Sequence, residues 1–356
     1  MVGKWHMCHK GSILVIHMSR QTVLLLFGGE SSEHDVSVMS ARNVYAAMDG
    51  EKYDVKLGYI DRTGKWWLLD NWTDSLNQHG GSQMLAAPGT KSFMVIPGNS
   101  IVHPDVILPI LHGSNGEDGT VQGLAKLLHI PIVGCDVTSS AVCMDKILTK
   151  QILEANGIKT AEYVVHRKGS LVPAYEETTE KLGEVLFVKP ACSGSSVGVS
   201  KVHNKQEFTP AINSALEYSD HVLIERAIIG RELETAVLGN PPKHKVSGIG
   251  EIVTGAEFYD YEDKYSSTSE AQVLTNIDLP ENVEDKIRQT SLKVYEVLGC
   301  KGLARVDYLL EGKTPYVIEV NTLPGFTNIS MYPKLWRATG MHYPELIDAL
   351  IASARQ

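Results

Sequence analysis

The first recognisable unit of the chain is a buried strand that runs through a glycine turn into a helix. Its sequence is TVLLLFGGESSEHDVSVMSARNVYAAM, and it starts at Thr22. The apolar residues after the turn recur at helical spacing, and Ser31 or Ser32 is predicted to cap the first helical turn. A strand, a tight turn and a helix in this order predict an α/β domain with parallel strands.

Two further apolar segments, YDVKLGYI and PDVILPIL, fit additional parallel strands of the same domain. Residues 61–104, which lie between them, are poorly patterned and are predicted to be a variable excursion. The domain is expected to close around IPIVGCD. Residues 1–20 contain only a short apolar patch and lack a small-residue cleavage site, so they are predicted to be an N-terminal extension rather than a signal peptide.

The remainder of the chain alternates helices and strands. From Thr138 the predicted order is helix, strand, strand, helix, strand, and the first helix covers SAVCMDKILTKQILEANGI and ends at Asn156 and Gly157. A longer helix is predicted from Glu281 to Leu298. A chain of 356 residues is too long for one ordinary core, which favours three mixed α/β lobes. The expected limits are 21–135 for an N-terminal α/β domain, 136–225 for a central lobe and 226–356 for a C-terminal lobe.

The composition excludes several classes of protein. Hydrophobic residues make up 43% and charged residues 21%, as in ordinary folded domains, and no apolar stretch approaches a membrane span. A net charge of −9 argues against nucleic-acid and anionic-membrane partners. The 5 cysteines are odd in number, widely spaced and without a CxxC pair, which predicts reduced thiols in a cytoplasmic protein.

Two neighbouring strands near the C-terminus carry polar residues. In GLARVDYLL, Arg305 and Asp307 share one face. In TPYVIEVN, the expected alternation puts Val317, Glu319 and Asn321 on one face and Tyr316, Ile318 and Val320 on the other. The short EGKTP connection predicts a hairpin, in which Asp307, Glu319 and Asn321 converge. Such oxygen ligands suit Mg²⁺ held partly by substrate phosphates, and the alternative is a solvated acidic face.

A metal of this kind calls for phosphates, and one loop could bind them. VKPACSGSSVGVSKV contains a Gly/Ser loop whose backbone N–H groups could surround an anion, with Lys189 at the end of the incoming strand. Lys146, in CMDK, is a second candidate cation. A plain hairpin loop is the alternative. The chain has no GxxxxGK[ST] motif, and GGESSEHDVS does not match GxGxxG, so any nucleotide binds by another scheme.

Three further positions have both a functional and a structural interpretation. EFYDYEDKYSSTSE is either an exposed loop or a lid that brings Lys264 to a phosphate and Tyr265 to an organic group. His112 and Glu117 follow a strand in LPILHGSNGEDGT, where ligands of α/β domains usually bind, although His112 could be structural. Glu33 could bind an ammonium group or could simply favour a helix N-terminus.

Asp118 belongs to the same strand-end loop. It could cap the helix that is predicted to begin near Thr120.

Seven stretches, taken in order, resemble the D-alanine–D-alanine ligases of the ATP-grasp superfamily. They are GGESSEHDVS, LHGSNGEDGT, CMDK, VKPACSGSSVGVSKV, YDYEDKY, ARVDY and EVNTLPGFTNIS. The resemblance runs from about Thr22 to the C-terminus. It implies an ATP-grasp fold of three lobes, in which two lobes clasp ATP, and two Mg²⁺ ions that Mn²⁺ could replace. It also implies a cytoplasmic homodimer that makes D-alanyl-D-alanine for peptidoglycan through an acyl phosphate.

The resemblance further implies which residues hold the metal and the nucleotide. The metal ligands would be Asp307, Glu319 and Asn321. The nucleotide would contact Lys146, Lys189, Ser195, Ser196, Glu225, Glu232 and Lys264. Within this set the lysines would contact phosphates, while Glu225 and Glu232 would lie near adenine and ribose.

The same resemblance implies residues for the substrates and the reaction. The substrate contacts would come from Glu33, His112, Ser330 and Met331, and the catalytic set would be Glu33, Ser195, Tyr265, Arg305, Gly325 and Ser330. Glu33 would receive the ammonium of the first D-alanine, and Ser330 would hold the carboxylate of the second. Ser195 and Tyr265 would link this pocket to a lid over residues 257–270. Arg305 and the backbone N–H of Gly325 would stabilise the oxyanion.

Two residues distinguish between members of the family. Tyr265 is typical of members whose second substrate attacks with an amine, and members that make D-alanyl-D-lactate typically replace it. Met331 resembles the apolar residue of alanine-specific enzymes. The alternatives that stay open are D-serine or D-lactate as the second substrate, and a non-catalytic amino-acid or nucleotide sensor. A sensor that only binds its ligand would not need all of the catalytic and metal-binding residues, and their joint presence argues against it. They are Ser195, Lys264, Arg305, Asp307, Glu319 and Asn321.

Overall fold

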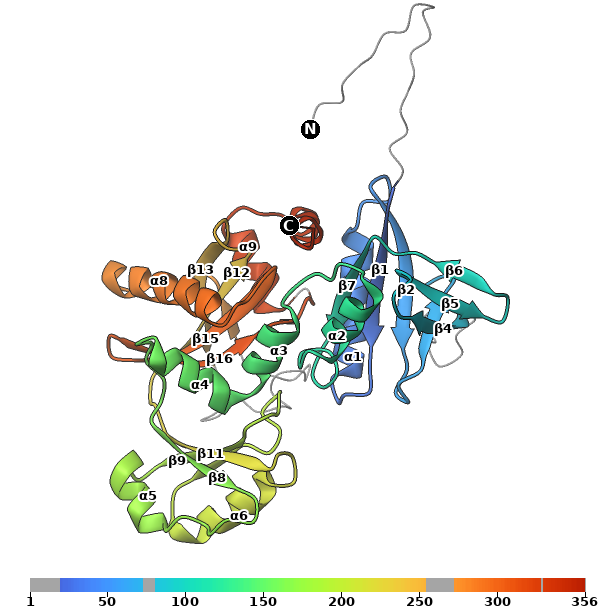
Figure 1. The fold of residues 1–356 in the computed structure, drawn as a ribbon. Coiled ribbons are helices and arrows are strands. Elements are labelled where there is room, and N and C mark those ends of the chain that lie inside the picture. Colours follow the sequence, from blue (N-terminus) through green and yellow to red (C-terminus); the bar gives the residue numbers. More distant parts are fainter. Residues whose placement is uncertain (1–19, 73–80, 254–271, 328, 356) are drawn as a thin grey trace, which may run out of the picture.

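The structure is a computed structural model that describes residues 20–72, 81–253, 272–327 and 329–355. These residues form sheets of seven, four and five strands, which follow one another along the chain. The N-terminal sheet lies beside the C-terminal lobe, and the central lobe extends away from the C-terminal lobe (Figure 1). The mixed α/β architecture of three lobes was therefore predicted correctly. Within the described ranges, no helix is long and apolar enough to cross a membrane.

The N-terminal sheet is built around the first predicted strand. That strand is β1 (Gln21–Gly28), and it pairs in parallel with β2 (Tyr53–Ile60) and β7 (Val106–Leu111), as predicted. Alternate side chains of β1 enter two different hydrophobic clusters, one shared with α1 (His34–Ala47) and one shared with α2 (Thr120–Leu128). Because strand side chains alternate between faces, a sheet covered on both faces requires the continuous apolar run of β1.

The predicted excursion is in fact an antiparallel extension of this sheet. It consists of β3 (Trp66–Leu69), β4 (Gly81–Ala87), β5 (Ser92–Ile96) and β6 (Ser100–Val102). Met84 and Phe93 are buried, whereas Leu85 and Met94, which pair across the strands, are 42% and 46% exposed. Since apolar side chains occupy both faces of β4 and β5, the period of two is hidden in the sequence.

The predicted helix after Thr138 is two helices. They are α3 (Val137–Met144) and α4 (Lys146–Ala155), and Asp145 separates them. The Asp145 side chain accepts hydrogen bonds from the N–H groups of Ile147 (2.9 Å) and Leu148 (3.1 Å), so the second helix begins with its own N-cap. The break places Lys146 at the first position of α4. The end of α4 was predicted correctly, because Asn156 is its C-cap and Gly157 follows with φ +70°.

The central sheet has the strand order β10-β9-β11-β8. Its elements are β8 (Tyr163–Arg167), α5 (Tyr175–Leu182), β9 (Leu186–Pro190), β10 (Ser200–Val202), α6 (Lys205–Ala215) and β11 (His221–Arg226). The Gly/Ser loop joins β9 to β10, and these two strands pair antiparallel. The sequence pattern did not reveal β8 or α5. Val165 of β8 is 36% exposed and α5 is largely polar, so neither element shows a strong apolar period.

The C-terminal sheet has the order β14-β13-β12-β15-β16. The strands are β12 (Arg231–Leu238), β13 (Lys245–Val253), β14 (Gln272–Leu274), β15 (Leu303–Glu311) and β16 (Thr314–Asn321). The helix α8 (Glu281–Val297) covers one face and ends one residue before the predicted position. The β15–β16 hairpin is confirmed.

The predicted alternation in β16 is wrong at one position. The register with β15 shifts, so that Asp307 faces Glu319 but Tyr308 faces Val317. Ile318 is therefore an extra residue, a β-bulge, and it returns Val317 to the same hydrophobic cluster as Val320. The bulge leaves Glu319 and Asn321 opposite the two polar residues of β15.

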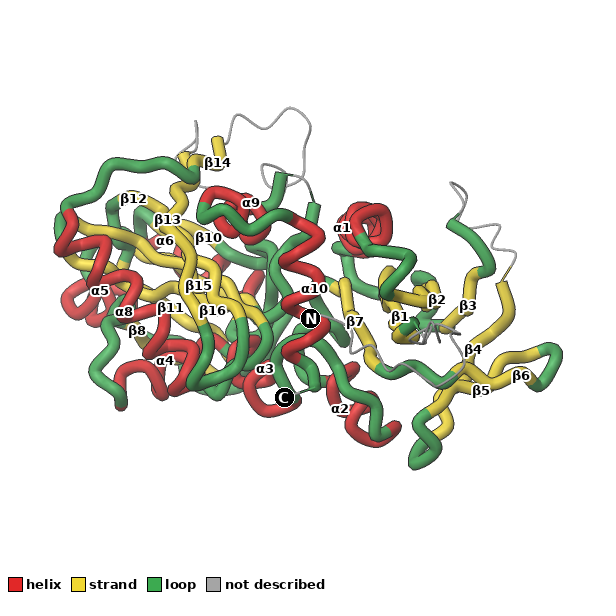
Figure 2. The backbone as a smooth tube through the Cα atoms, turned by 90° about the horizontal axis from the view of Figure 1, so that it is seen from above, coloured by secondary structure: helices red, strands yellow, loops and turns green. Residues whose placement is uncertain are grey.

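The last two helices join the lobes. They are α9 (Met331–Ala338) and α10 (Tyr343–Ser353), and α10 lies between the C-terminal lobe and the N-terminal sheet (Figure 2). Asp348 of α10 accepts hydrogen bonds from Lys52 (2.6 Å) and Tyr53 (2.7 Å) at the start of β2. Buried residues of α1, β1 and α10 belong to one hydrophobic cluster, so the N-terminal and C-terminal lobes share a continuous core.

The helix break yields a first prediction. Replacing Asp145 by Ala removes both N-cap hydrogen bonds of α4, so the free energy of unfolding should fall by about 1 kcal/mol. Asp145→Asn keeps a side-chain acceptor and is the matched control, which should retain most of the stability. Urea unfolding of both variants measures the difference. An equal loss in the two variants would contradict the capping role.

Candidate active site

The β15–β16 hairpin brings together the polar residues that were predicted to converge on it. Asp307 lies directly opposite Glu319, and Arg305 lies opposite Asn321. On the other side of β15, Glu234 of β12 faces Asp307. The result is a row of polar side chains across the three adjacent strands β12, β15 and β16.

Arg305 is the centre of this row. Its guanidinium donates to both carboxylate oxygens of Asp307, at 2.7 Å and 2.6 Å, and it lies 3.0 Å from a carboxylate oxygen of Glu234. Asp307 and Glu234 are buried, with 3% and 5% of their surface exposed. Burial opposes the charge of Arg305, but Asp307 and Glu234 raise its pKa well above the usual value, so it stays protonated.

The charges of this row do not cancel. Two buried carboxylates face one guanidinium, and Glu319 adds a third carboxylate that also interacts with Arg305. In the described part of the chain, no group of three or more His, Cys, Asp or Glu side chains is placed to hold a metal. Two carboxylates and an amide nevertheless match the donor set of Mg²⁺, which usually completes its shell with phosphate and water. The excess negative charge therefore fits a divalent cation.

Two of the predicted lysines, Lys146 and Lys189, lie next to the Gly/Ser loop of the central sheet. The backbone N–H of Lys146 donates to the carbonyl of Ala191 (3.0 Å), and its ammonium donates to the carbonyl of Ser193. Both ends of Lys146 are thus fixed to the Gly/Ser loop. Burial lowers the pKa of Lys146, and Glu319 opposes that shift. Lys189, on β9, lies 2.5 Å from a carboxylate oxygen of Glu225 on the adjacent β11.

The Gly/Ser loop has an unusual backbone. Ser195 and Ser196 are consecutive residues in the left-handed region, with φ of +52° and +59°. This conformation is uncommon for residues other than glycine, and such strain is concentrated at binding and catalytic sites. A Cβ atom placed on Gly194 would lie 3.8 Å from a carboxylate oxygen of Glu33. The loop of the central lobe therefore reaches the N-terminal domain.

Glu33 occupies the N-cap position of α1, and only 8% of its surface is exposed. A Cβ atom on Gly113, which has φ +73°, would lie 2.9 Å from the Glu33 carboxylate, so the close approach requires glycine. The predicted serine cap is wrong, because no side chain caps α1 at this position. Ser31 instead donates to the carbonyl of His112 (2.6 Å) and accepts from the N–H of Glu33 (3.2 Å).

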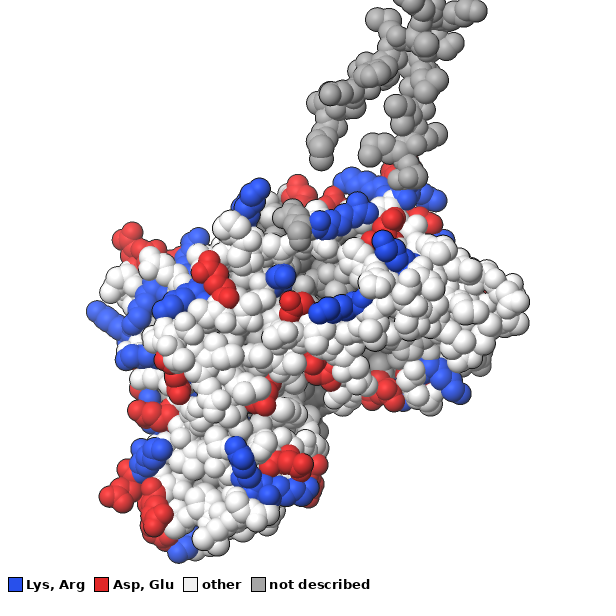
Figure 3. Space-filling view, viewed as in Figure 1, with Lys and Arg blue, Asp and Glu red and all other residues white. Residues whose placement is uncertain are grey.

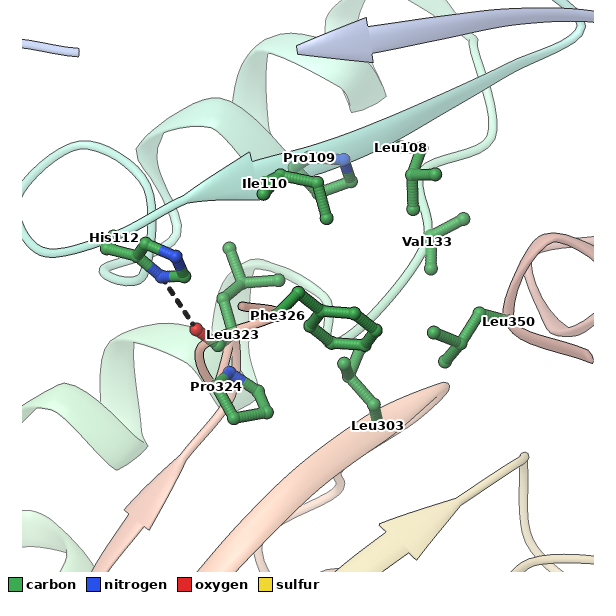
Figure 4. Close-up of a pocket in the computed structure, with 10 residues that line it drawn as sticks. All are labelled: Leu108, Pro109, Ile110, His112, Val133, Leu303, Leu323, Pro324, Phe326 and Leu350. Carbon is green, nitrogen blue, oxygen red and sulfur yellow. Dashed lines mark hydrogen bonds between the residues drawn. The ribbon is translucent and has the colours of Figure 1, made fainter. Parts of the chain in front are cut away.

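His112 connects two lobes. Its Nδ1 lies 3.1 Å from the carbonyl of Leu323, just after β16 (Figure 4). Its Nε2 lies 3.3 Å from the hydroxyl of Ser40. The carbonyl can only accept, so Nδ1 donates and Nε2 accepts from Ser40. Burial lowers the pKa of His112, which keeps the ring neutral at pH 7. The ring also borders a small apolar cavity of about 10 Å³, lined by Pro324 and Phe326 (Figure 4).

The turn after β16 positions the last predicted residues. A Cβ atom on Gly325 would lie 2.8 Å from the hydroxyl of Ser330, which interacts with the N–H (3.0 Å) and the hydroxyl (2.7 Å) of Thr327. Gly325 and Ser330 are thus neighbours, as expected. Met331 is 4% exposed and packs in the hydrophobic core against Gly250.

Of the remaining predicted residues, Glu232 lies in the described part of the chain and the lid residues do not. Glu232 lies on β12, where it pairs in register with Ile252 and Leu309. Lys264, Tyr265 and the predicted lid over residues 257–270 lie outside the described residues.

Sequence reasoning did not assign roles to several residues that the structure brings to the site. Burial and the Glu33 carboxylate raise the pKa of Glu117 well above its usual value. Glu234 completes the Arg305 cluster, and Lys150 forms an ion pair with Glu225. The glutamate in GEDGT was a visible signal for Glu117, whereas Lys150 looks like any helical lysine. The N-cap of α2 is Gly119, one residue after the predicted Asp118, whose carboxylate nevertheless accepts from the N–H of Thr120 (3.0 Å).

Two family models match the sequence over most of its length. One is described as D-ala D-ala ligase N-terminus and matches residues 22–135, and the other is described as D-ala D-ala ligase C-terminus and matches residues 152–352. The chain belongs to the D-alanine–D-alanine ligase family. A member from Sodalis glossinidius, named D-alanine--D-alanine ligase, is 44% identical over 94% of this chain and 95% of its own length.

Solved structures of D-alanine ligases have the same fold. The VanG D-Ala:D-Ser ligase from Enterococcus faecalis superposes with a TM-score of 0.86, at 33% identity over 94% of this chain and 99% of that one. The D-alanine--D-alanine ligase from Bacillus anthracis complexed with ATP gives 0.73, at 31% identity over 94% of this chain and 98% of that one. The ATP-grasp fold predicted from the sequence is therefore confirmed.

The buried histidine of this D-alanine–D-alanine ligase family member yields a pH prediction. In the unfolded chain His112 binds a proton near pH 6.5, whereas burial lowers its pKa in the folded state despite the facing Glu33 carboxylate; Arg305 also faces it and favours the neutral ring. The unfolded state then binds more protons, so His112 lowers the stability as the pH falls below about 6.5.

Chemical unfolding of the wild type and His112→Gln at several pH values measures this effect. The wild type should be the more stable at pH 7.5, and the difference should shrink toward pH 5.5. A difference that stays constant over this range would contradict a neutral buried His112.

Proposed function

We propose that this protein uses ATP to join two D-alanine molecules into D-alanyl-D-alanine. One observation supports this most directly, namely the position of Glu319. Its carboxylate influences the pKa of three groups: Lys146, whose ammonium is bonded to the Gly/Ser loop of the central lobe, Glu117 of the N-terminal domain, and Arg305 of the C-terminal sheet. A carboxylate near charged groups from these three parts of the chain supports a reaction between a phosphate and an amino acid at their junction.

The proposed reaction has two steps. The carboxylate of the first D-alanine attacks the γ-phosphorus of ATP, and the bond to the β-phosphate oxygen breaks, which gives an acyl phosphate and ADP. The amine of the second D-alanine then attacks the acyl carbon, loses a proton, and expels inorganic phosphate. Binding both amino acids next to the phosphate converts a reaction of three molecules into one within a single complex.

The residues that carry the D-alanines are proposed from their positions. Glu33 binds the ammonium of the first D-alanine, next to the neutral His112. Ser330 binds the carboxylate of the second, and Met331 contributes an apolar wall behind it. The guanidinium of Arg305 and the backbone N–H of Gly325 stabilise the negative oxygen that develops on the acyl carbon. The buried setting strengthens these contacts because water does not screen them.

The proposed nucleotide contacts come from the two clasping lobes. Lys146 and Lys189 contact phosphates together with Lys264, and Ser195 and Ser196 offer backbone N–H groups from their left-handed conformation. Glu225 and Glu232 lie toward adenine and ribose, and both carboxylate oxygens of Glu225 are held by Lys150 and Lys189 rather than by the nucleotide. Tyr265 links the first D-alanine site to the lid through Ser195.

Magnesium is proposed at the hairpin. Asp307, Glu319 and Asn321 would hold two ions, which Mn²⁺ could replace. Bound there, the metal supplies positive charge that neutralises the phosphates of ATP. These side chains present oxygen ligands from adjacent strands, and the excess negative charge around Arg305 supports the assignment.

The cellular role follows from the product. A D-alanyl dipeptide serves peptidoglycan precursor synthesis, and thus cell-wall biogenesis and cell shape, in the cytoplasm. We also propose a homodimer, with domain limits at 21–135, 136–225 and 226–356. Acidic and basic side chains are interspersed over the face drawn in Figure 3, which does not favour nucleic acid as a partner.

Product analysis tests the function. The protein is incubated with ATP, Mg²⁺ and D-alanine, alone or with D-serine or D-lactate, and the products are identified by mass. We expect ADP release that depends on D-alanine, with D-alanyl-D-alanine as the main product. A mixed product would instead identify D-serine or D-lactate as the preferred second substrate. The likeness to a D-Ala:D-Ser ligase favours D-serine as this second candidate. Ligand binding without turnover would leave only a sensor.

The metal assignment yields a separate prediction. Glu319→Gln keeps the shape of the side chain but removes one anionic ligand, so the Mg²⁺ concentration for half-maximal activity should rise by at least about tenfold. Glu311→Gln is the matched control, because Glu311 lies on the same hairpin but pairs with Arg226 (3.1 Å). Equal Mg²⁺ requirements for the two variants would reject Glu319 as a ligand.

A further inference from the structure

Lys150 is a buried lysine that no step of the proposed reaction uses. It lies in the second turn of α4, with 2% of its side chain exposed, among the largest fully buried side chains of the described chain. Lysine is almost never fully buried unless it is paired, because moving an ammonium out of water costs several kcal/mol. Burial accordingly lowers the pKa of Lys150, and Glu225 opposes that shift. Packing alone does not require an ammonium at this position.

The ammonium of Lys150 has three partners. It lies 2.6 Å from Oε1 of Glu225, donates to the carbonyl of Ala161 at 3.0 Å, and lies 5.2 Å from the centre of the Tyr163 ring. These contacts come from β11 and from the segment that leads into β8. Lys150 is therefore fixed from several sides and has no route to a ligand.

Glu225 is shared between two lysines. Lys150 contacts its Oε1 at 2.6 Å, while Lys189 contacts its Oε2 at 2.5 Å. Burial alone would raise the pKa of Glu225, but Lys189 and Lys150 together lower it to about 2. The trio carries two positive charges and one negative charge. Lys189 is the most exposed member, at 19% of its side chain, so the excess positive charge lies on the accessible side of the trio. Lys189 also acts on Lys146, whose ammonium is bonded to the Gly/Ser loop.

We propose that Lys150 is a positioning residue that neutralises Glu225 from the protein interior and so keeps the ammonium of Lys189 available for a nucleotide phosphate. Without Lys150, Glu225 and Lys189 would form a one-to-one ion pair, and a phosphate would have to compete with the carboxylate. With Lys150 present, the carboxylate of Glu225 keeps a buried counter-ion even when Lys189 contacts a phosphate. The inference rests on the proposed function, because it assumes that Lys189 binds phosphate.

A merely structural role makes a different prediction. If Lys150 were only a structural counter-ion of Glu225, replacing it by an apolar side chain of similar length would lower the stability of the lobe, because removing one partner of a buried ion pair leaves the other uncompensated. Any effect on binding would then be the same for ligands with and without phosphate. The proposal predicts a loss that depends on the phosphate and on the charge of Glu225.

Calorimetry on the full chain with ADP and with adenosine tests this. Lys150→Met should raise the Kd for ADP by about tenfold, which corresponds to about 1.4 kcal/mol, while the Kd for adenosine changes little. Lys205→Met is the matched control in the same lobe, because Lys205 is 66% exposed and pairs with Glu176 on the surface. It should leave both Kd values unchanged.

A double-mutant cycle makes the test independent of how well Lys150→Met folds. In the Glu225→Gln background there is no buried carboxylate to neutralise, so adding Lys150→Met should not weaken ADP binding further. A further tenfold loss in that background, or an equal loss for adenosine, would overturn the proposal. A wild-type protein that binds neither ADP nor ATP would instead reject the nucleotide site of the proposed function, and this inference with it.

Discussion

The ion cluster around Arg305 is the interaction on which the rest of the site depends. A guanidinium held by Asp307 and Glu234 inside a sheet is costly to bury, and it is stable because both carboxylates contact it directly. The bidentate geometry also fixes the side chain. The cluster retains excess negative charge, and its Glu319 favours the charged form of Lys146 beside the Gly/Ser loop. Under the proposed function, the C-terminal sheet would thereby determine where a cation and a polyphosphate bind.

The site exists only when three lobes are together, and specific contacts hold them there. His112 of the N-terminal domain bonds to the carbonyl of Leu323 in the C-terminal lobe. Asp348 of the last helix bonds to Lys52 at the start of β2. Gly194 brings the central loop to the Glu33 carboxylate. The first and third of these contacts involve a backbone carbonyl and a glycine, and the second pairs two residues without a proposed role at the site, so the contacts set distances without using up the charges that a substrate would need.

The sequence predicted those parts of the fold and the site whose causes are local. The apolar run of β1 and the EGKTP connection act within a few residues, and both were interpreted correctly. The bulge at Ile318 was not predictable, because it depends on the register with β15. Strands β4 and β5 were not predicted, because apolar residues on both of their faces hide the period of two. The ion pair of Lys150 was not predicted because its partner, Glu225, lies 75 positions further along the chain. The features that the sequence pattern missed are therefore those that depend on residues far apart along the chain.

Opposite charges alternate from the protein interior toward the binding site. Lys150 lies deepest, Glu225 contacts it, and Lys189 contacts Glu225 and is the most exposed of the three. Each buried charge thus has a fixed partner of the opposite sign, and the last charge is positive. A phosphate could therefore contact Lys189 without breaking the ion pair between Lys150 and Glu225. At the β15–β16 hairpin, Arg305 is held by two carboxylates and the excess charge is negative, so a cation would be attracted there. Lys146 interacts with both Lys189 and Glu319, so it relates the positive cluster to the negative one. Under the proposed function, the negative cluster would hold the metal and the positive cluster the phosphates.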